Sequence, residues 1–251
     1  MLKTYSQGTS SAHPPLLIVH GLFGSARNWG VIAKRLSDDR VTYTVDMRNH
    51  GESPRYPTQS YEDMAQDLAE VIKGIKGPVD VLGHSMGGKS AMVLALQSPE
   101  LVNRLLVADI APVRYTHTQM PLIHAMRDLD LSTIEKRSDA DRALQQSIPE
   151  EGVRAFLLQS LDVKAKEWRL NLDVLGDEMD KIIGFPEVSG QFDKPTLFLS
   201  GGASEYVLPE HRAGIKSLFT DAYFAKMPNV GHWLHAEKPR EFEASIRAFF
   251  N

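Results

Sequence analysis

Cysteine is absent from this chain of 251 residues. Its absence excludes disulfide bonds, thiolate metal sites and a cysteine nucleophile. No apolar run is long enough to span a bilayer, and Met1–Ser6 lacks the apolar segment of a secretory signal. The formal net charge of −4 gives no support for a nucleic-acid or anionic-membrane partner. We therefore expect a soluble, cytoplasmic protein.

The rest of the composition is that of an ordinary globular protein. Hydrophobic residues make up 42% of the sequence and charged residues 24%. The length suits one α/β domain with a sizeable core, or such a domain with an insertion. No internal repeat or low-complexity segment interrupts the chain.

The stretch Gly83–Gly87 reads Gly-His-Ser-Met-Gly. It follows a β-branched run, Pro78–Leu82, that is typical of a buried strand, and it precedes the helix-forming run 88–96. Strand, Gly-x-Ser-x-Gly and helix together define a nucleophile elbow, with Ser85 at the tip of a tight turn. The short pattern also occurs by chance in turns that merely contain a buried serine. The flanking elements favour the elbow.

Short apolar runs predict the other strands of a mostly parallel sheet. They are Leu16–Val19, Val41–Asp46, Leu105–Ala108, Pro195–Ser200 and Ala222–Met227, with an edge strand over Leu2–Tyr5. Helices are predicted over Asn28–Leu36, from Ser60 to the glycines Gly74 and Gly77, over Pro209–Phe219 and over Pro239–Phe250. Because ligands bind at the C-terminal ends of parallel strands, residues that follow these runs are candidates for the site.

Between about Pro112 and Phe185 no strand-like run occurs. Short amphipathic helices are predicted over 121–129, 138–146, 150–161 and 170–183. We name residues 112–185 the cap segment, and we expect a helical insertion on the ligand side of a core formed by 1–111 and 186–251. Its apolar residues Met120, Met126, Phe156, Trp168 and Met179 are candidates for an acyl pocket. Packing between helices is the simpler interpretation of each.

Two residues at the same sheet edge are candidates to activate Ser85. A serine hydroxyl needs a base within hydrogen-bond reach, and that base needs an orienting carboxylate. His232 follows the last strand, and Asp109 follows the strand after the elbow helix. Glu205 is the alternative acid. His232 and His235 could instead form a metal pair, but no third ligand clusters with them, so we predict no metal site.

His20–Gly24 reads His-Gly-Leu-Phe-Gly and follows the first buried strand. Glycines there let the backbone approach a substrate, so the N–H groups of Leu22 and Met86 are predicted to form an oxyanion hole. His20 is interpreted first as a packed histidine that fixes this loop. Tentative substrate contacts are His20, Phe23, Met120, Phe156, Trp168 and Trp233.

These motifs resemble the α/β-hydrolase superfamily over nearly the whole chain, and within it the small bacterial YbfF-type serine esterases. The resemblance is carried by His20–Ser25, Asp46–Gly51, Gly83–Lys89, Asp109–Pro112 and Gly231–Trp233. It implies an α/β-hydrolase fold, activity on acyl esters or acyl-CoA, and no cofactor. Most members of the superfamily place the acid after the strand that ends here at Ser200, where this chain has Glu205 and no aspartate. The YbfF-type proteins take it from the earlier strand, which maps to Asp109.

The sequence therefore predicts a serine esterase that acts through Ser85, His232, Asp109 and an acyl-enzyme intermediate, with a small acyl ester as its partner. An acyl-CoA thioesterase or a C–C bond hydrolase would use the same residues. A non-catalytic ligand-binding protein on this fold is the alternative outside the enzymes. An aspartate-nucleophile dehalogenase or epoxide hydrolase is disfavoured because serine occupies the elbow. Neither the acyl chain length nor the oligomeric state follows from the sequence.

Overall fold

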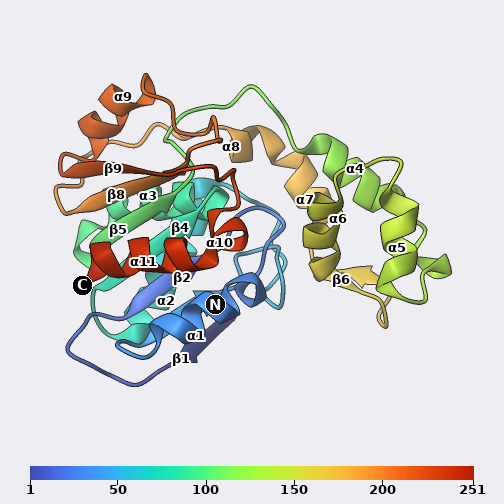
Figure 1. Cartoon of the computed structure of the whole chain (residues 1–251), viewed down its shortest axis with the longest axis horizontal. Coiled ribbons are helices and arrows are strands. Elements are labelled where there is room, and N and C mark those ends of the chain that lie inside the picture. Colours follow the sequence, from blue (N-terminus) through green and yellow to red (C-terminus); the bar gives the residue numbers. More distant parts are fainter.

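A seven-stranded sheet forms the centre of the computed structural model, which describes residues 1–251 (Figure 1). The strands lie in the order β1-β3-β2-β4-β5-β8-β9, and only β1 runs antiparallel to its neighbour. Their bounds are β1 Thr4–Gln7, β2 Leu16–Val19, β3 Thr42–Val45, β4 Val79–His84, β5 Val102–Ala108, β8 Thr196–Gly201 and β9 Ala222–Met227. The predicted fold class is confirmed: a mostly parallel sheet flanked by helices.

Helices cover both faces of the sheet because successive side chains of a strand point to opposite sides. Leu16 and Ile18 of β2 pack on one face, against α1 (Gly30–Leu36) and α11 (Pro239–Phe250). Leu17 and Val19 belong to the apolar cluster on the other face, which also contains residues of α2 (Tyr61–Ile75), α3 (Met86–Gln97) and α9 (His211–Leu218). The central strands are therefore buried on both faces, which explains their continuous apolar runs.

The cap segment lies to one side of the sheet (Figure 1). It contains α4 (Met120–Asp128), α5 (Arg137–Leu144), α6 (Glu151–Leu157), α7 (Leu172–Asp177) and α8 (Met179–Ile183). It also contains a small antiparallel pair, β6 (Leu161–Asp162) and β7 (Glu167–Trp168), so the expectation of no strand there is wrong. Two-residue strands are too short to produce a visible alternation of apolar and polar residues.

Several predicted helix boundaries need correction. The helix predicted over 170–183 is split into α7 and α8 at Glu178, and the one over 150–161 ends as an α-helix at Leu157 and continues as a 3₁₀ turn. Helix α2 ends at Ile75 because Lys76, not a glycine, takes the left-handed conformation (φ 68°). Residues 26–29 form a 3₁₀ turn before α1, and α10 (Leu234–Glu237) precedes α11. None of the helices is both long and apolar enough to cross a membrane.

The register of the central strands brings distant residues to one edge of the sheet. His84 lies beside Ala108, and Ala108 lies beside Leu199. The N–H of Ser85 donates to the Ala108 carbonyl at 3.1 Å, and the N–H of Asp109 donates to the Leu199 carbonyl at 2.9 Å. The residues that follow β4, β5 and β8 therefore meet at the C-terminal edge.

Candidate active site

Ser85 stands in the tight turn between β4 and α3. Its backbone has φ 53° and ψ −122°, a conformation that costs a non-glycine residue about 1–3 kcal/mol. The turn is possible because Gly83 has no side chain: a Cβ there would lie 2.5 Å from the Gly87 carbonyl oxygen. The tight approach of strand to helix leaves the Ser85 hydroxyl at the start of α3, on the cavity described below.

His232, in the loop between β9 and α10, joins Ser85 to Asp109. The Ser85 Oγ lies 3.0 Å from Nε2 of His232, and Nδ1 of the same ring lies 2.7 Å from Oδ2 of Asp109. A carboxylate can only accept, so Nδ1–H donates to Asp109 and Nε2 accepts from the serine hydroxyl. This arrangement can take a proton from Ser85 and stabilise the resulting imidazolium.

Asp109 is fully buried and also has a left-handed backbone (φ 52°). Its Oδ1 accepts the Gly201 N–H at 2.9 Å, and its Oδ2 accepts the Ser204 hydroxyl at 2.5 Å besides the histidine. Glu205 is exposed and makes no hydrogen bond to His232. No sequence pattern indicates Ser204, which precedes the alternative acid Glu205 in the loop after β8.

Two aromatic side chains contact His232, one at its ring and one at its main chain. Tyr206 stacks on it, with ring centroids 4.1 Å apart and planes at 22°. His84 donates its Nε2–H to the His232 carbonyl at 2.9 Å. Burial, and next the neighbouring histidines His232 and His235, hold the pKa of His84 well below its ordinary value. His84 is therefore a neutral support, and Tyr206 is a further site residue that no sequence motif indicated.

The backbone N–H groups of Leu22 and Met86, the predicted oxyanion donors, lie near Ser85. The Leu22 N–H donates to no backbone or side-chain acceptor in the structure. Met86 is the first residue of α3, so its N–H has no partner within the helix. The two predicted donors thus lie in the loop after β2 and at the first residue of α3.

Two buried histidines shape the loop that carries Leu22. His20 accepts the Met47 N–H at 2.9 Å, and His50 accepts the Phe23 N–H at 3.2 Å while Phe23 has a φ of 63°. Burial lowers the pKa of His20 to about 4 and that of His50 to about 3, so both rings are neutral. These contacts support the interpretation of His20 as a packed histidine that fixes this loop.

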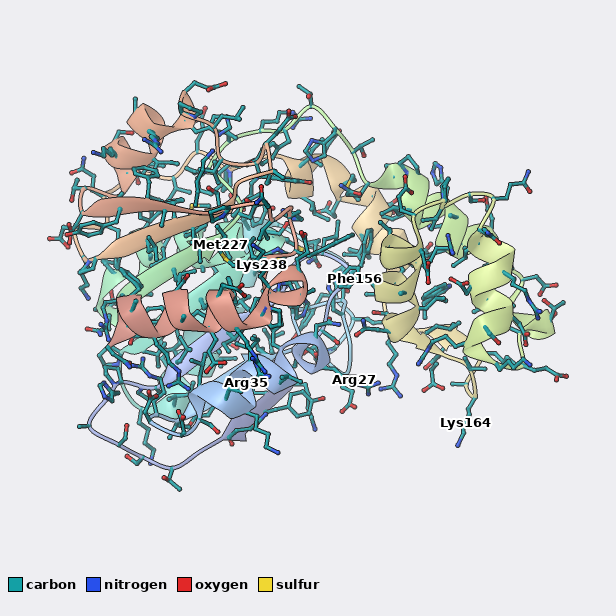
Figure 2. The ribbon with its side chains drawn as sticks, in the orientation of Figure 1. Arg27, Arg35, Phe156, Lys164, Met227 and Lys238 are labelled. Atoms are coloured by element: carbon teal, nitrogen blue, oxygen red, sulfur yellow. The ribbon has the colours of Figure 1, made fainter.

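A cavity of about 100 Å³ opens beside Ser85, between the core and the cap segment. Phe156 of α6 lies at the side of the cap segment nearest the core (Figure 2). There its ring packs against that of Trp233, with the ring centroids 5.7 Å apart. The cavity is lined by core residues that include His20, Leu22, Phe23, Tyr206, His232 and Trp233, and by cap residues Gln119, Leu122, Val153, Phe156 and Leu157. Most of the cap lining is apolar.

The structure places the other predicted pocket residues elsewhere. Trp168 is buried within the cap segment, where its Nε1–H donates to the Met126 carbonyl at 2.9 Å. Met126 and Met179 are core residues of the cap segment. Met120 faces a different surface hollow beside Arg114. Trp168, Met126 and Met179 therefore pack the cap helices together. The sequence does not show this, because the side of each helix that faces Ser85 depends on how the helices are arranged. No three histidine or carboxylate side chains are grouped to hold a metal.

The fold is that of an α/β-hydrolase, and the chain belongs to that family: residues 16–245 match the group described as "Alpha/beta hydrolase family". It is 42% identical to the mouse sn-1-specific diacylglycerol lipase ABHD11 over 94% of this chain and 80% of that protein. It is 38% identical to esterase YbfF of Escherichia coli over 94% of this chain and 93% of that protein. A solved "Marine microorganism esterase" superposes with a TM-score of 0.94 at 37% identity, and the match covers 99% of this chain and 98% of that one. The expected resemblance is confirmed, and these similarities support esterase or lipase activity.

Proposed function

We propose that this protein is a serine esterase that hydrolyses acyl esters through an acyl-enzyme intermediate. The observation that carries the proposal is the unbroken sequence of contacts from Ser85 through His232 to Asp109, at 3.0 Å and 2.7 Å. Such an arrangement is the activated-nucleophile unit of acyl transfer. Its position at the edge of the apolar cavity brings an acyl group within reach.

In the proposed reaction, Ser85 attacks the ester carbonyl carbon while His232 takes the hydroxyl proton. The carbonyl oxygen becomes negatively charged and accepts hydrogen bonds from the N–H groups of Leu22 and Met86. His232 then gives its proton to the departing alcohol, which leaves an acyl group on Ser85. A water molecule repeats the steps: His232 takes its proton, the acid is released, and the proton returns to Ser85. Asp109 holds the ring and stays ionised throughout.

The substrate we propose is a carboxylic ester with an apolar acyl group. Leu122, Val153 and Phe156 line the cavity with hydrocarbon, which favours such a group through burial of apolar surface. The relatives named above as a diacylglycerol lipase and as an esterase act on ester bonds, which agrees with this class of substrate.

Replacing the nucleophile tests the proposal. Ser85→Ala should lower kcat on p-nitrophenyl acetate by about 10⁶-fold, as loss of a catalytic serine does elsewhere. Ser90→Ala is the matched control, because Ser90 lies in α3, five residues after Ser85, and donates to the Met86 carbonyl at 2.9 Å instead of contacting His232. A fluorophosphonate should label the wild type and the control once, at Ser85. Labelling of another residue, or an active Ser85→Ala variant, would contradict the proposal.

A further inference from the structure

Lys89 is a buried lysine that the proposed reaction does not use. It lies in the first turn of α3, four residues after Ser85, and only 1% of its surface is exposed. Its backbone N–H donates to the Ser85 carbonyl at 3.0 Å. A group that binds the Lys89 side chain is therefore connected, through one residue and one backbone hydrogen bond, to the turn that contains Ser85.

The ammonium of Lys89 binds three main-chain carbonyl oxygens, all from the two ends of the cap segment. Nζ lies 2.8 Å from the Val113 carbonyl, where the chain leaves the core. It lies 3.0 Å from the Ile183 carbonyl and also binds that of Gly184, where the chain returns. Ile183 is the last residue of α8, so its carbonyl has no partner within the helix. One side chain thus joins the entry and the exit of the cap segment.

No carboxylate compensates the charge of Lys89. None of the hydrogen-bond partners of its Nζ is a carboxylate, and its other neighbours are the rings of Tyr115 at 4.7 Å and Tyr61 at 5.7 Å. Burial, and secondly the charge of Arg114, lower the pKa of the ammonium to about 7. Burying an unpaired charge is unfavourable, so the three carbonyls and two rings must offset that cost. A methionine would fill the same space without the cost of burying a charge.

The same junction forms the wall of a second, smaller cavity at Ser85. This cavity of about 50 Å³ is bordered by Ser85 and Lys89 and, on the cap side, by Tyr115, Ile182 and Ile183. A displacement of either end of the cap segment would move this wall. It would also move the helices that carry Leu122 and Phe156 over the larger cavity.

We propose that Lys89 is a positioning residue that fixes the cap segment over Ser85 by holding its two ends on the nucleophile helix. In this way it determines how well the cavity fits longer acyl groups. The inference rests on the proposed function for its kinetic consequence, whereas the anchoring itself is independent of any reaction. It needs no contact between Lys89 and the reacting atoms.

The test compares Lys89→Met with wild type in two measurements. The first is the ratio of kcat/KM for p-nitrophenyl octanoate to that for the acetate, which should fall about tenfold because a displaced cap loses contacts that only the longer acyl group makes. The second is amide hydrogen exchange, read by mass spectrometry, which should become at least about tenfold faster in 113–120 and 179–185.

Lys194→Met is the matched control. Lys194 also donates to two main-chain carbonyls, those of Pro99 at 2.7 Å and Val102 at 2.8 Å, but they lie outside the cap segment. This variant should lose stability without changing the ester ratio or the exchange of the cap ends, so it separates positioning from general destabilisation.

An unchanged ratio and unchanged exchange in Lys89→Met overturn the proposal, and so does an equal effect of Lys194→Met. If Lys89→Met does not fold, Lys89→Gln replaces it, and a ratio within about twofold of wild type then overturns the proposal. Fluorophosphonate labelling of the wild type separates the two inferences. Failure to label Ser85 refutes the esterase proposal, whereas labelling with an unaffected Lys89 variant refutes only the role of Lys89.

Discussion

Replacing Asp109 by asparagine exchanges one carboxylate oxygen for an NH₂ group. The hydrogen bonds in the structure determine which of the two oxygens is replaced. Oδ1 of Asp109 accepts the Gly201 N–H, so an asparagine must keep its oxygen there. Its NH₂ group then takes the place of Oδ2, facing Nδ1 of His232 and the Ser204 hydroxyl. An amide donor at this point can pair only with an unprotonated Nδ1.

The imidazole would therefore carry its proton on Nε2, the atom that lies 3.0 Å from the Ser85 hydroxyl. A protonated Nε2 cannot accept the serine proton, so the general base is lost while the geometry is kept. The expected fall in kcat is about 10⁴-fold, which corresponds to about 5 kcal/mol of transition-state stabilisation. KM should change little, because Asp109 does not line the cavity.

The assay is steady-state hydrolysis of p-nitrophenyl acetate by Asp109→Asn and by Glu205→Gln. The glutamate is exposed and makes no hydrogen bond to His232, so its variant should stay within about tenfold of wild type. Circular dichroism spectra of both variants, compared with wild type, check that each variant folds. The reasoning is refuted if Glu205→Gln is the severely impaired variant, or if Asp109→Asn raises KM and leaves kcat unchanged.

Two further predictions concern the cavity and acid stability. Phe156→Ala should lower kcat/KM for p-nitrophenyl octanoate about tenfold relative to the acetate, whereas Met120→Ala, outside the cavity, should leave that ratio unchanged; equal effects would contradict our assignment of the lining. Below pH 6.5 the unfolded chain binds protons that His20 and His50 cannot take up in the folded protein until about pH 4 and 3. Each should therefore lower the unfolding free energy by up to about 1.4 kcal/mol per pH unit as the pH falls through this window. Urea denaturation at pH 7 and pH 5 measures the slope, which His50→Gln should reduce; a slope that this variant leaves intact would argue against the assignment.

Features that depend on residues close together in the chain can be predicted from the amino-acid sequence. The buried strands were evident because each is a short apolar run, and the turn at Ser85 was evident because Gly83 and Gly87 must flank it for steric reasons. The order of Ser85, Asp109 and His232 along the chain indicated one sheet edge, since parallel strands end at the same side.

What those residues contact cannot be predicted in the same way, because the contacts join segments far apart in the chain. Ser204 reaches Asp109 across 95 residues, and Lys89 reaches Gly184 across 95 residues as well. The cap helices showed apolar residues, but which of them face Ser85 depends on how the helices are rotated and packed. Phe156 therefore lies in the cavity while Trp168, equally apolar in sequence, packs within the cap segment, because periodicity specifies an apolar face and not its partner.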